Sequence, residues 1–338
     1  MKKILVRILK LMLALCISGA FAYFAFRRVN LTQVYEIVLG VKYPYVFFMF
    51  LTVLGAQVLR SYRWGVMLHP IVPLSQRILF PVSSIGFMFI VLLPARLGEI
   101  VRPYLIHQNG QINMTTAMAT VILERILDSF FILIFLGMTI ISLELPSWVI
   151  HGATYTVIIL VTISGLIFLG SLNIVSQQLR RQMEKYFPKR FNDLAHILLE
   201  RFYEGMGVLG KGRQALVIIL LTAGIWGTFV LSNLLLIRAF QLPLGAFAAM
   251  SVLAITALGI SVPAGPGFIG NFHFFCILGL SFFGIEKEIA LGYAMVNHVV
   301  MMGTIILLGV LFLNISHLNL GFKNLGRLRS LARGMSIE

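Results

Sequence analysis

The sequence is poor in cysteine. Its 338 residues include two cysteines, Cys16 and Cys276, and each stands in an apolar run without a second cysteine at CxxC spacing. A disulfide framework or a thiolate metal site needs several cysteines at defined intervals, so this composition favours neither. We expect both cysteines to act as packing residues.

The chain also lacks the motifs of several enzyme classes. It contains no HExxH, no GxSxG, no His/Cys cluster with metal spacing and no Gly-rich loop that ends in GK[ST]. These absences argue against hydrolysis, a bound metal and nucleotide binding. We therefore expect a protein that is not an enzyme and that carries no cofactor.

Charge is scarce as well. Charged residues make up 12% of the chain and hydrophobic residues 59%, and the mean hydropathy is +0.94. Soluble domains carry about 25% charged residues, so this composition indicates a polytopic membrane protein. The net charge of +15 agrees with the positive-inside rule better than with nucleic-acid binding. We expect a multi-pass protein of the plasma membrane.

Apolar runs fill most of the length. A helix needs about 20 apolar residues to cross the hydrocarbon layer. We expect crossing helices near residues 6–26, 44–60, 117–141, 148–173, 215–240 and 288–314. Two further runs are interrupted by proline and glycine, at 78–95 and 244–284. We expect re-entrant segments there, over 78–107 and 244–284.

Basic residues indicate the orientation of these segments. The stretch 174–214 and the C-terminal tail are rich in Lys and Arg, so the positive-inside rule places both in the cytoplasm. With a cytoplasmic N-terminus, this holds only if each interrupted run enters and leaves on one side. We expect cytoplasmic termini and a cytoplasmic linker helix over 174–214.

The two interrupted runs resemble each other. PARLGE begins at Pro94 and PAGPGF at Pro263, which are 263 − 94 = 169 residues apart, and Asp128 and Asn297 are separated by the same interval. Chance recurrence of Pro-Ala is the alternative. We favour one all-α transmembrane domain, a helix bundle whose halves 1–173 and 215–338 form an inverted repeat. Broken helices of such repeats meet near the midplane of transporters.

Charged residues of both signs follow the first interrupted run. In PARLGEIVRPYLI, Arg96, Glu99 and Arg102 are spaced three apart, so a helix places them near one face. A charge at the centre of a membrane helix costs at least about 2.5 to 3.5 kcal/mol, and such residues need partners. The acid among the bases is a poor fit to a pure orientation signal.

A second charged cluster lies downstream. VILERILDSF contains Glu124, Arg125 and Asp128 within two helical turns. We expect Arg96 or Arg102 to pair with one of these acids, which leaves a spare guanidinium to bind an anionic headgroup. For Arg102 and Arg125, a solvated position at the cytoplasmic interface is an equal alternative.

Two other sets of residues are candidates. Arg60 and Arg63 close the second expected helix beside Tyr62 and Trp64, a pattern typical of interfacial anchoring, with lipid phosphate contact as the second possibility. The loop SVPAGPGFIGNFHFF exposes backbone amides that suit an oxyanion. The candidate polar lining around this loop consists of Gly265, Gly267, Gly270, Asn271, His273 and Asn297. For Asn271, His273 and Asn297 taken singly, an interfacial or hydrogen-bonded structural role is the favoured alternative.

The motifs RSYRW, PARLGEIVRPYLI, LERILD and SVPAGPGFIG, in this order, resemble the flippase-like family that includes the transmembrane region of lysylphosphatidylglycerol synthases. The resemblance implies a bundle with re-entrant helices that binds or moves lipids, in some members an aminoacylated phospholipid. It does not identify the lipid, because relatives serve several envelope-lipid pathways. Asn271 and His273 stand where many relatives have a Glu. The chain has no soluble aminoacyl-transfer domain, so we do not expect it to make the modified lipid.

These observations together predict a lipid translocase. Its substrate would be an anionic-headgroup lipid or a lipid-linked intermediate that moves between leaflets. A membrane-embedded transferase and a non-transporting scaffold of a lipid-synthesis complex are the alternatives. A lipid-synthesis enzyme or a glycosyltransferase is the expected protein partner, and nucleic acid is not.

The orientation is testable at Gln177, a polar position in the basic stretch. We expect a Gln177→Cys variant to react with a membrane-impermeant maleimide in inside-out vesicles and not in intact cells. Labelling in intact cells would show that the stretch lies outside and that the orientation is wrong.

Overall fold

The structure is a computed structural model that describes residues 2–108, 112–143, 212–262 and 265–315, with a few positions between 146 and 162. Within these ranges the secondary structure is helical and no strand occurs. The predicted span 148–173 lies largely outside them, and so does the predicted linker up to residue 211.

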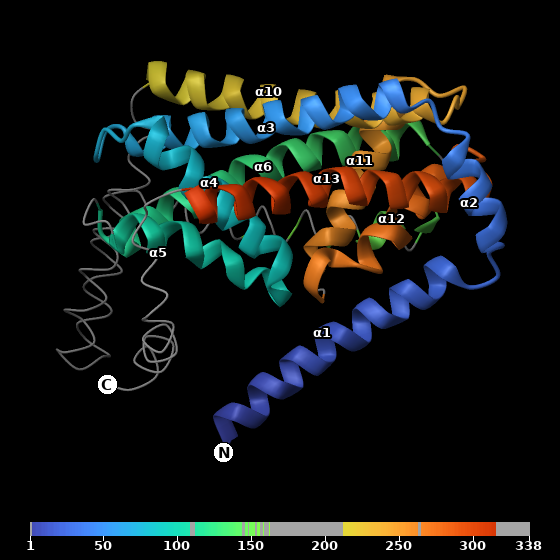
Figure 1. The fold of residues 1–338 in the computed structure, drawn as a ribbon, viewed down its shortest axis with the longest axis horizontal. Coiled ribbons are helices and arrows are strands. Elements are labelled where there is room, and N and C mark those ends of the chain that lie inside the picture. The colour runs from blue at the N-terminus through green and yellow to red at the C-terminus, as the bar shows by residue number, and fades with distance from the viewer. Residues whose placement is uncertain are drawn as a thin grey trace.

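The first half contains α1 to α6 and the second half begins with α10 (Figure 1). The first-half elements are α1 (Lys2–Phe26), α2 (Leu31–Leu39), α3 (Tyr43–Leu68), α4 (Gln76–Leu92), the 3-10 helix η1 (Pro94–Ile100), α5 (Val101–Gln108) and α6 (Met114–Ser142). The second-half elements are α10 (Gly212–Ala239), α11 (Ala246–Ser261), the 3-10 helix η3 (Pro266–Phe268), α12 (Asn271–Ser281) and α13 (Lys287–Ile315).

Three of the described helices are long and apolar enough to cross a membrane, namely α3, α10 and α13. They contain 26, 28 and 29 residues. At 1.5 Å per residue they extend about 40 Å, more than the roughly 30 Å of hydrocarbon. Helix α6 is equally long, with 29 residues, but carries three charged side chains in its first half. The predicted class, an all-α polytopic membrane protein, is confirmed.

Helix α3 is longer than predicted. The sequence suggested an end near residue 60, but the helix continues to Leu68. The basic and aromatic side chains that were interpreted as an interfacial end include Arg63 and Trp64, which are 1% and 0% exposed. Arg63 and Trp64 thus belong to a helical turn packed inside the protein and do not mark the end of the helix at the membrane interface.

Each interrupted run forms two short helices around a break. Helices α4 and α11 have 17 and 16 residues, which is about 25 Å and short for a full crossing. After α4, η1 returns against it so closely that a Cβ on Gly98 would overlap the backbone of Phe89 and Ile90. After α11, Gly267 and Gly270 adopt φ angles of 71° and 92°, which favour glycine. The helices η1 and η3 contact each other. That these pairs are re-entrant stays a prediction.

The elements recur at a nearly constant interval. The ends of α4 and α11 are 261 − 92 = 169 residues apart, and the starts of α5 and α12 are 271 − 101 = 170 apart. Helices α3 and α10 lie side by side and run in opposite directions (Figure 1). The inverted repeat itself stays a prediction.

The contact of η1 with α4 predicts a difference between two glycines. Gly98→Ala must push η1 away from backbone atoms, which cannot rotate aside, so we expect a loss of about 1 to 3 kcal/mol in stability. Gly137→Ala, in α6, meets no atom within 4 Å and is the control. Thermal unfolding of the purified protein in detergent measures both. Equal melting temperatures for the two variants would contradict the close packing of η1.

Candidate functional site

Helix α6 carries two buried carboxylates one turn apart, Glu124 and Asp128, which are 0% and 9% exposed. Arg102 of α5 approaches Glu124, with 2.6 Å between Nη1 and Oε2. Arg63 of α3 forms a bidentate ion pair with Asp128, with Nη1 2.7 Å from Oδ1 and Nη2 3.3 Å from Oδ2. Its Nε lies 3.7 Å from Oε1 of Glu124. The acids of α6 therefore join α3 and α5.

Arg102 is enclosed on every side, with an exposure of 0%. Its guanidinium lies 4.1 Å from the ring centroid of Trp64 and 4.8 Å from that of Phe87. Its aliphatic stem occupies the place that a Cβ would take on Gly86. The rings and Glu124 together compensate the buried charge of Arg102.

Asp128 accepts contacts from three helices. Besides Arg63, it meets Nη2 of Arg125 at 3.3 Å and Nε1 of Trp226 at 3.4 Å. Arg63 also donates to the hydroxyl of Thr222 at 3.1 Å. Trp226 and Thr222 belong to α10, so the network also links the two halves of the chain.

Arg60 differs from the other arginines. Its guanidinium lies between the rings of Phe87 and Phe229, 4.8 Å and 4.7 Å from their centroids. No carboxylate of the described residues lies within 4 Å of it. Among the described residues, the direct side-chain contacts of this guanidinium are therefore with aromatic faces.

A cavity of about 200 Å³ adjoins Arg60. Its polar lining residues are Arg60, Glu99, Arg125, Asp128, Ser129 and Ser261. The rest of the lining is mainly apolar and comes from α4, α6, α10, α11, η3 and α13, including Ile132, Phe229, Leu253, Ile260, Phe268, Met301, Met302 and Ile305. A water takes about 30 Å³ in the liquid, so the cavity has room for several waters or a phosphate-sized anion. Both interrupted segments reach it, through Glu99 of η1 and Phe268 of η3.

The polar residues around the second break form a separate cluster. Ser18 of α1 accepts the N–H of Gly265 at 2.7 Å and donates to Asn271 at 3.3 Å. Nε2 of His298 lies 2.7 Å from the carbonyl oxygen of Gly267. The rings of His273 and His298 have centroids 4.9 Å apart. These contacts hold the second break against α1 and α13.

A third polar group lies between α10 and α13. The hydroxyl of Tyr293 donates to Asn233, and the amide of Asn297 donates to the same side chain at 3.2 Å. None of the second-break candidates, and not Asn297, lines the cavity described above. The oxyanion site predicted at the backbone amides of the second break is therefore separate from the arginine cluster.

The structure brings the first-half candidates together largely as predicted. The pairing of Arg102 with Glu124 is confirmed, and an interfacial position for Arg102 is wrong because its side chain is buried. Interfacial anchoring by Arg63 is wrong for the same reason, and Arg60 lines the cavity. Arg125 is 30% exposed. The side chain of Arg96 lies outside the described part of the chain.

Several site residues were missed in the sequence. The aromatic partners Phe87, Trp226 and Phe229 and the hydroxyl of Thr222 had no motif to mark them, and Trp64 was interpreted as an interfacial residue. Trp64 directly follows Arg63, and this adjacency was the one usable signal. The others belong to apolar runs in which any aromatic residue is typical of a membrane helix.

Comparisons with known proteins agree with the motifs. Residues 11–309 match the family model described as the lysylphosphatidylglycerol synthase TM region. A UPF0104 membrane protein of Methanothermobacter thermautotrophicus is 25% identical over 267 residues, which cover 73% of this chain and 78% of that protein. A search of the solved structures found no match.

The ion pairs predict a large effect at Glu124. Glu124→Ala leaves the fully buried Arg102 without a carboxylate, so we expect a loss of about 3 to 5 kcal/mol in stability. The double variant Arg102→Met/Glu124→Leu removes both charges and should recover part of this loss. Melting temperature and yield in detergent measure the effect.

The control for this prediction is Glu36→Ala, because Glu36 is an exposed carboxylate on α2. It should change stability by about 0.5 kcal/mol or less. If Glu124→Ala melted at the same temperature as Glu36→Ala, the buried pair would contribute nothing to folding.

Proposed function

Because the chain belongs to the family of the lysylphosphatidylglycerol synthase TM region, we propose that it is a translocase that moves an anionic-headgroup lipid or lipid-linked intermediate between membrane leaflets. The family implies a function in a membrane and related to lipids. The translocation and the sign of the headgroup are our proposal, and they rest on the chemistry of the cavity.

The observation that carries the proposal is the guanidinium of Arg60 in the cavity wall. Among the described residues it meets aromatic rings and no carboxylate. Arg60 is half-buried, and a cation partly removed from water is stabilised by an anion beside it. A phosphate fits best, because its oxygens match the planar fork of a guanidinium.

The charge of the whole cluster points the same way. The basic members are Arg60, Arg63, Arg102 and Arg125, and the acidic members are Glu99, Glu124 and Asp128. With all groups ionised, these described members carry one positive charge in total, which an anionic headgroup would offset. This balance favours an anionic lipid over a zwitterionic one.

The arginines have different tasks in this proposal. Arg63 and Arg102 are bound to the acids of α6 and hold α3, α5 and α6 together. Arg60 binds the phosphate. Arg125, which is 30% exposed and contacts Asp128 at 3.3 Å, exchanges between this acid and the arriving headgroup. The apolar wall receives the first carbons of the lipid beyond the phosphate.

The place of the cavity suits transport. It lies where η1 and η3 meet, between the two halves of the chain. In transporters built from inverted repeats, a site between broken helices opens to either side as one repeat rocks against the other. A headgroup held there would be released to the opposite leaflet.

Reconstitution tests the proposal. Purified protein is placed in vesicles of phosphatidylcholine and phosphatidylglycerol with a trace of fluorescent phosphatidylglycerol, and leaflet exchange is followed by reduction of the outer-leaflet dye. A hydrogen bond to a charged group contributes about 1.5 to 3 kcal/mol, so Arg60→Ala should slow exchange by at least about tenfold. Arg60→Lys keeps the charge without the fork and should be intermediate.

The matched control is Arg77→Ala, which removes an exposed arginine at the start of α4. It should exchange lipid at the unmodified rate. Wild-type exchange by a folded Arg60→Ala protein would refute the role of Arg60. A covalently altered lipid without exchange would indicate a transferase, and neither product nor exchange would indicate a scaffold.

A further inference from the structure

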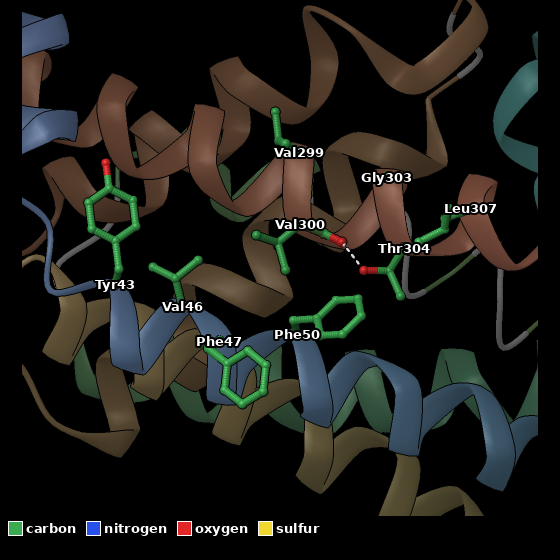
Figure 2. A pocket seen from close by; sticks show the side chains of 9 residues that line it. All are labelled: Tyr43, Val46, Phe47, Phe50, Val299, Val300, Gly303, Thr304 and Leu307. Carbon is green, nitrogen blue, oxygen red and sulfur yellow. Dashed lines mark hydrogen bonds between the residues drawn. The ribbon is translucent and has the colours of Figure 1, made fainter.

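A second hollow lies between α3 and α13 (Figure 2). It is a groove of about 450 Å³. Its lining residues are Tyr43, Val46, Phe47 and Phe50 of α3, and Val299, Val300, Gly303, Thr304 and Leu307 of α13. Both helices have the length and composition of membrane spans, so this groove faces hydrocarbon.

The two hydroxyl groups of the groove are already used. Thr304 donates to the carbonyl of Val300 in its own helix at 2.5 Å (Figure 2). Tyr43, at the start of α3, donates to the carbonyl of Val38 at 3.3 Å. The wall between them presents aliphatic and aromatic carbon, which suits a hydrocarbon chain and offers nothing to a polar ligand.

One end of the groove is basic. Lys42 directly precedes Tyr43 and is exposed, and its backbone N–H donates to the carbonyl of Ala239 at 3.0 Å. This bond brings the end of α10, with the exposed Arg238, to the same place. Tyrosine beside Lys and Arg is typical of the membrane interface, where a lipid phosphate lies.

The same two turns of α13 border both hollows. Val299, Gly303 and Leu307 line the groove, whereas Met301 and Ile305 line the cavity beside Arg60. A chain in the groove and a headgroup in the cavity would therefore be separated by the thickness of one helix. Gly303 carries no side chain, and a Cβ there would meet nothing within 4 Å, so the floor of the groove is open.

We propose that the groove between α3 and α13 binds an acyl chain of an anionic phospholipid, and that this lipid is the one whose headgroup enters the cavity. The second part rests on the proposed function. The acyl chain stays in the groove, in contact with the bilayer, while the phosphate moves from the basic end of the groove at Lys42 into the cavity. Gly303 admits the chain.

A bulky residue at Gly303 tests the groove. Gly303→Phe should fill it without disturbing its surroundings, and Gly227→Phe is the matched control, because this exposed glycine of α10 also meets no atom within 4 Å. The probe is phosphatidylglycerol with a diazirine on one acyl chain. After illumination, mass spectrometry identifies the peptides that carry lipid.

In the wild type we expect adducts on the segments 43–50 and 299–307. Each buried methylene favours binding, so Gly303→Phe should lower these adducts and the rate of leaflet exchange by about tenfold, while Gly227→Phe changes neither. Unchanged adducts in Gly303→Phe, or adducts spread evenly over all lipid-facing helices, would overturn the proposal. So would efficient cross-linking of two copies through Phe47→Cys in place of lipid adducts.

The two readouts separate this inference from the proposed function. Adducts in the groove without leaflet exchange by the wild type would support the lipid site and refute translocation. Leaflet exchange that is unaffected by Gly303→Phe, with no adduct in the groove, would refute the groove and leave translocation standing.

Discussion

The structure depends on the compensation of buried charge. In the described part of the chain, Arg60, Arg63, Arg102 and Arg125 lie in or beside the interior of the helix bundle, and two carboxylates on adjacent turns of α6 bind Arg63 and Arg102. An isolated ion in hydrocarbon is costly, so the packing of α3, α5 and α6 must bring each buried arginine to a carboxylate. The faces of aromatic rings stabilise the positive charge that the carboxylates do not neutralise. Among the described residues, the guanidinium of Arg60 contacts aromatic rings and no carboxylate.

Much of the fold could be predicted from hydropathy and from the positions of proline and glycine. Long apolar runs predict α6, α10 and α13 to within a few residues, because the thickness of the bilayer sets their length. The breaks at Pro94 and within SVPAGPGFIGN were readable because proline and glycine interrupt helices. The end of α3 was not readable, since RSYRW has the same composition in a buried network as at an interface. Only its neighbours in space distinguish the two.

The candidate site divides in the same way. The alternation of acids and bases in PARLGEIVRPYLI and LERILD was sufficient to expect an ion pair, because unpaired charge is not tolerated in the membrane. Which arginine each acid would choose depends on the crossing of α3 with α6, which spacing does not encode. The aromatic platforms under Arg60 and Arg102 were hidden, because phenylalanine and tryptophan are common in every apolar run.

The sequence distance between the partners has a consequence for biogenesis. Arg63 and Asp128 are 65 residues apart, and the chain emerges from the ribosome with its N-terminus first. Helix α3 therefore reaches the membrane with its arginines unpaired, well before α6 can supply the carboxylates. Its final burial must wait for the later helix, so the insertion of α3 is completed only when α6 arrives. Until then its charged end belongs in the aqueous channel of the insertion machinery or in the headgroup layer.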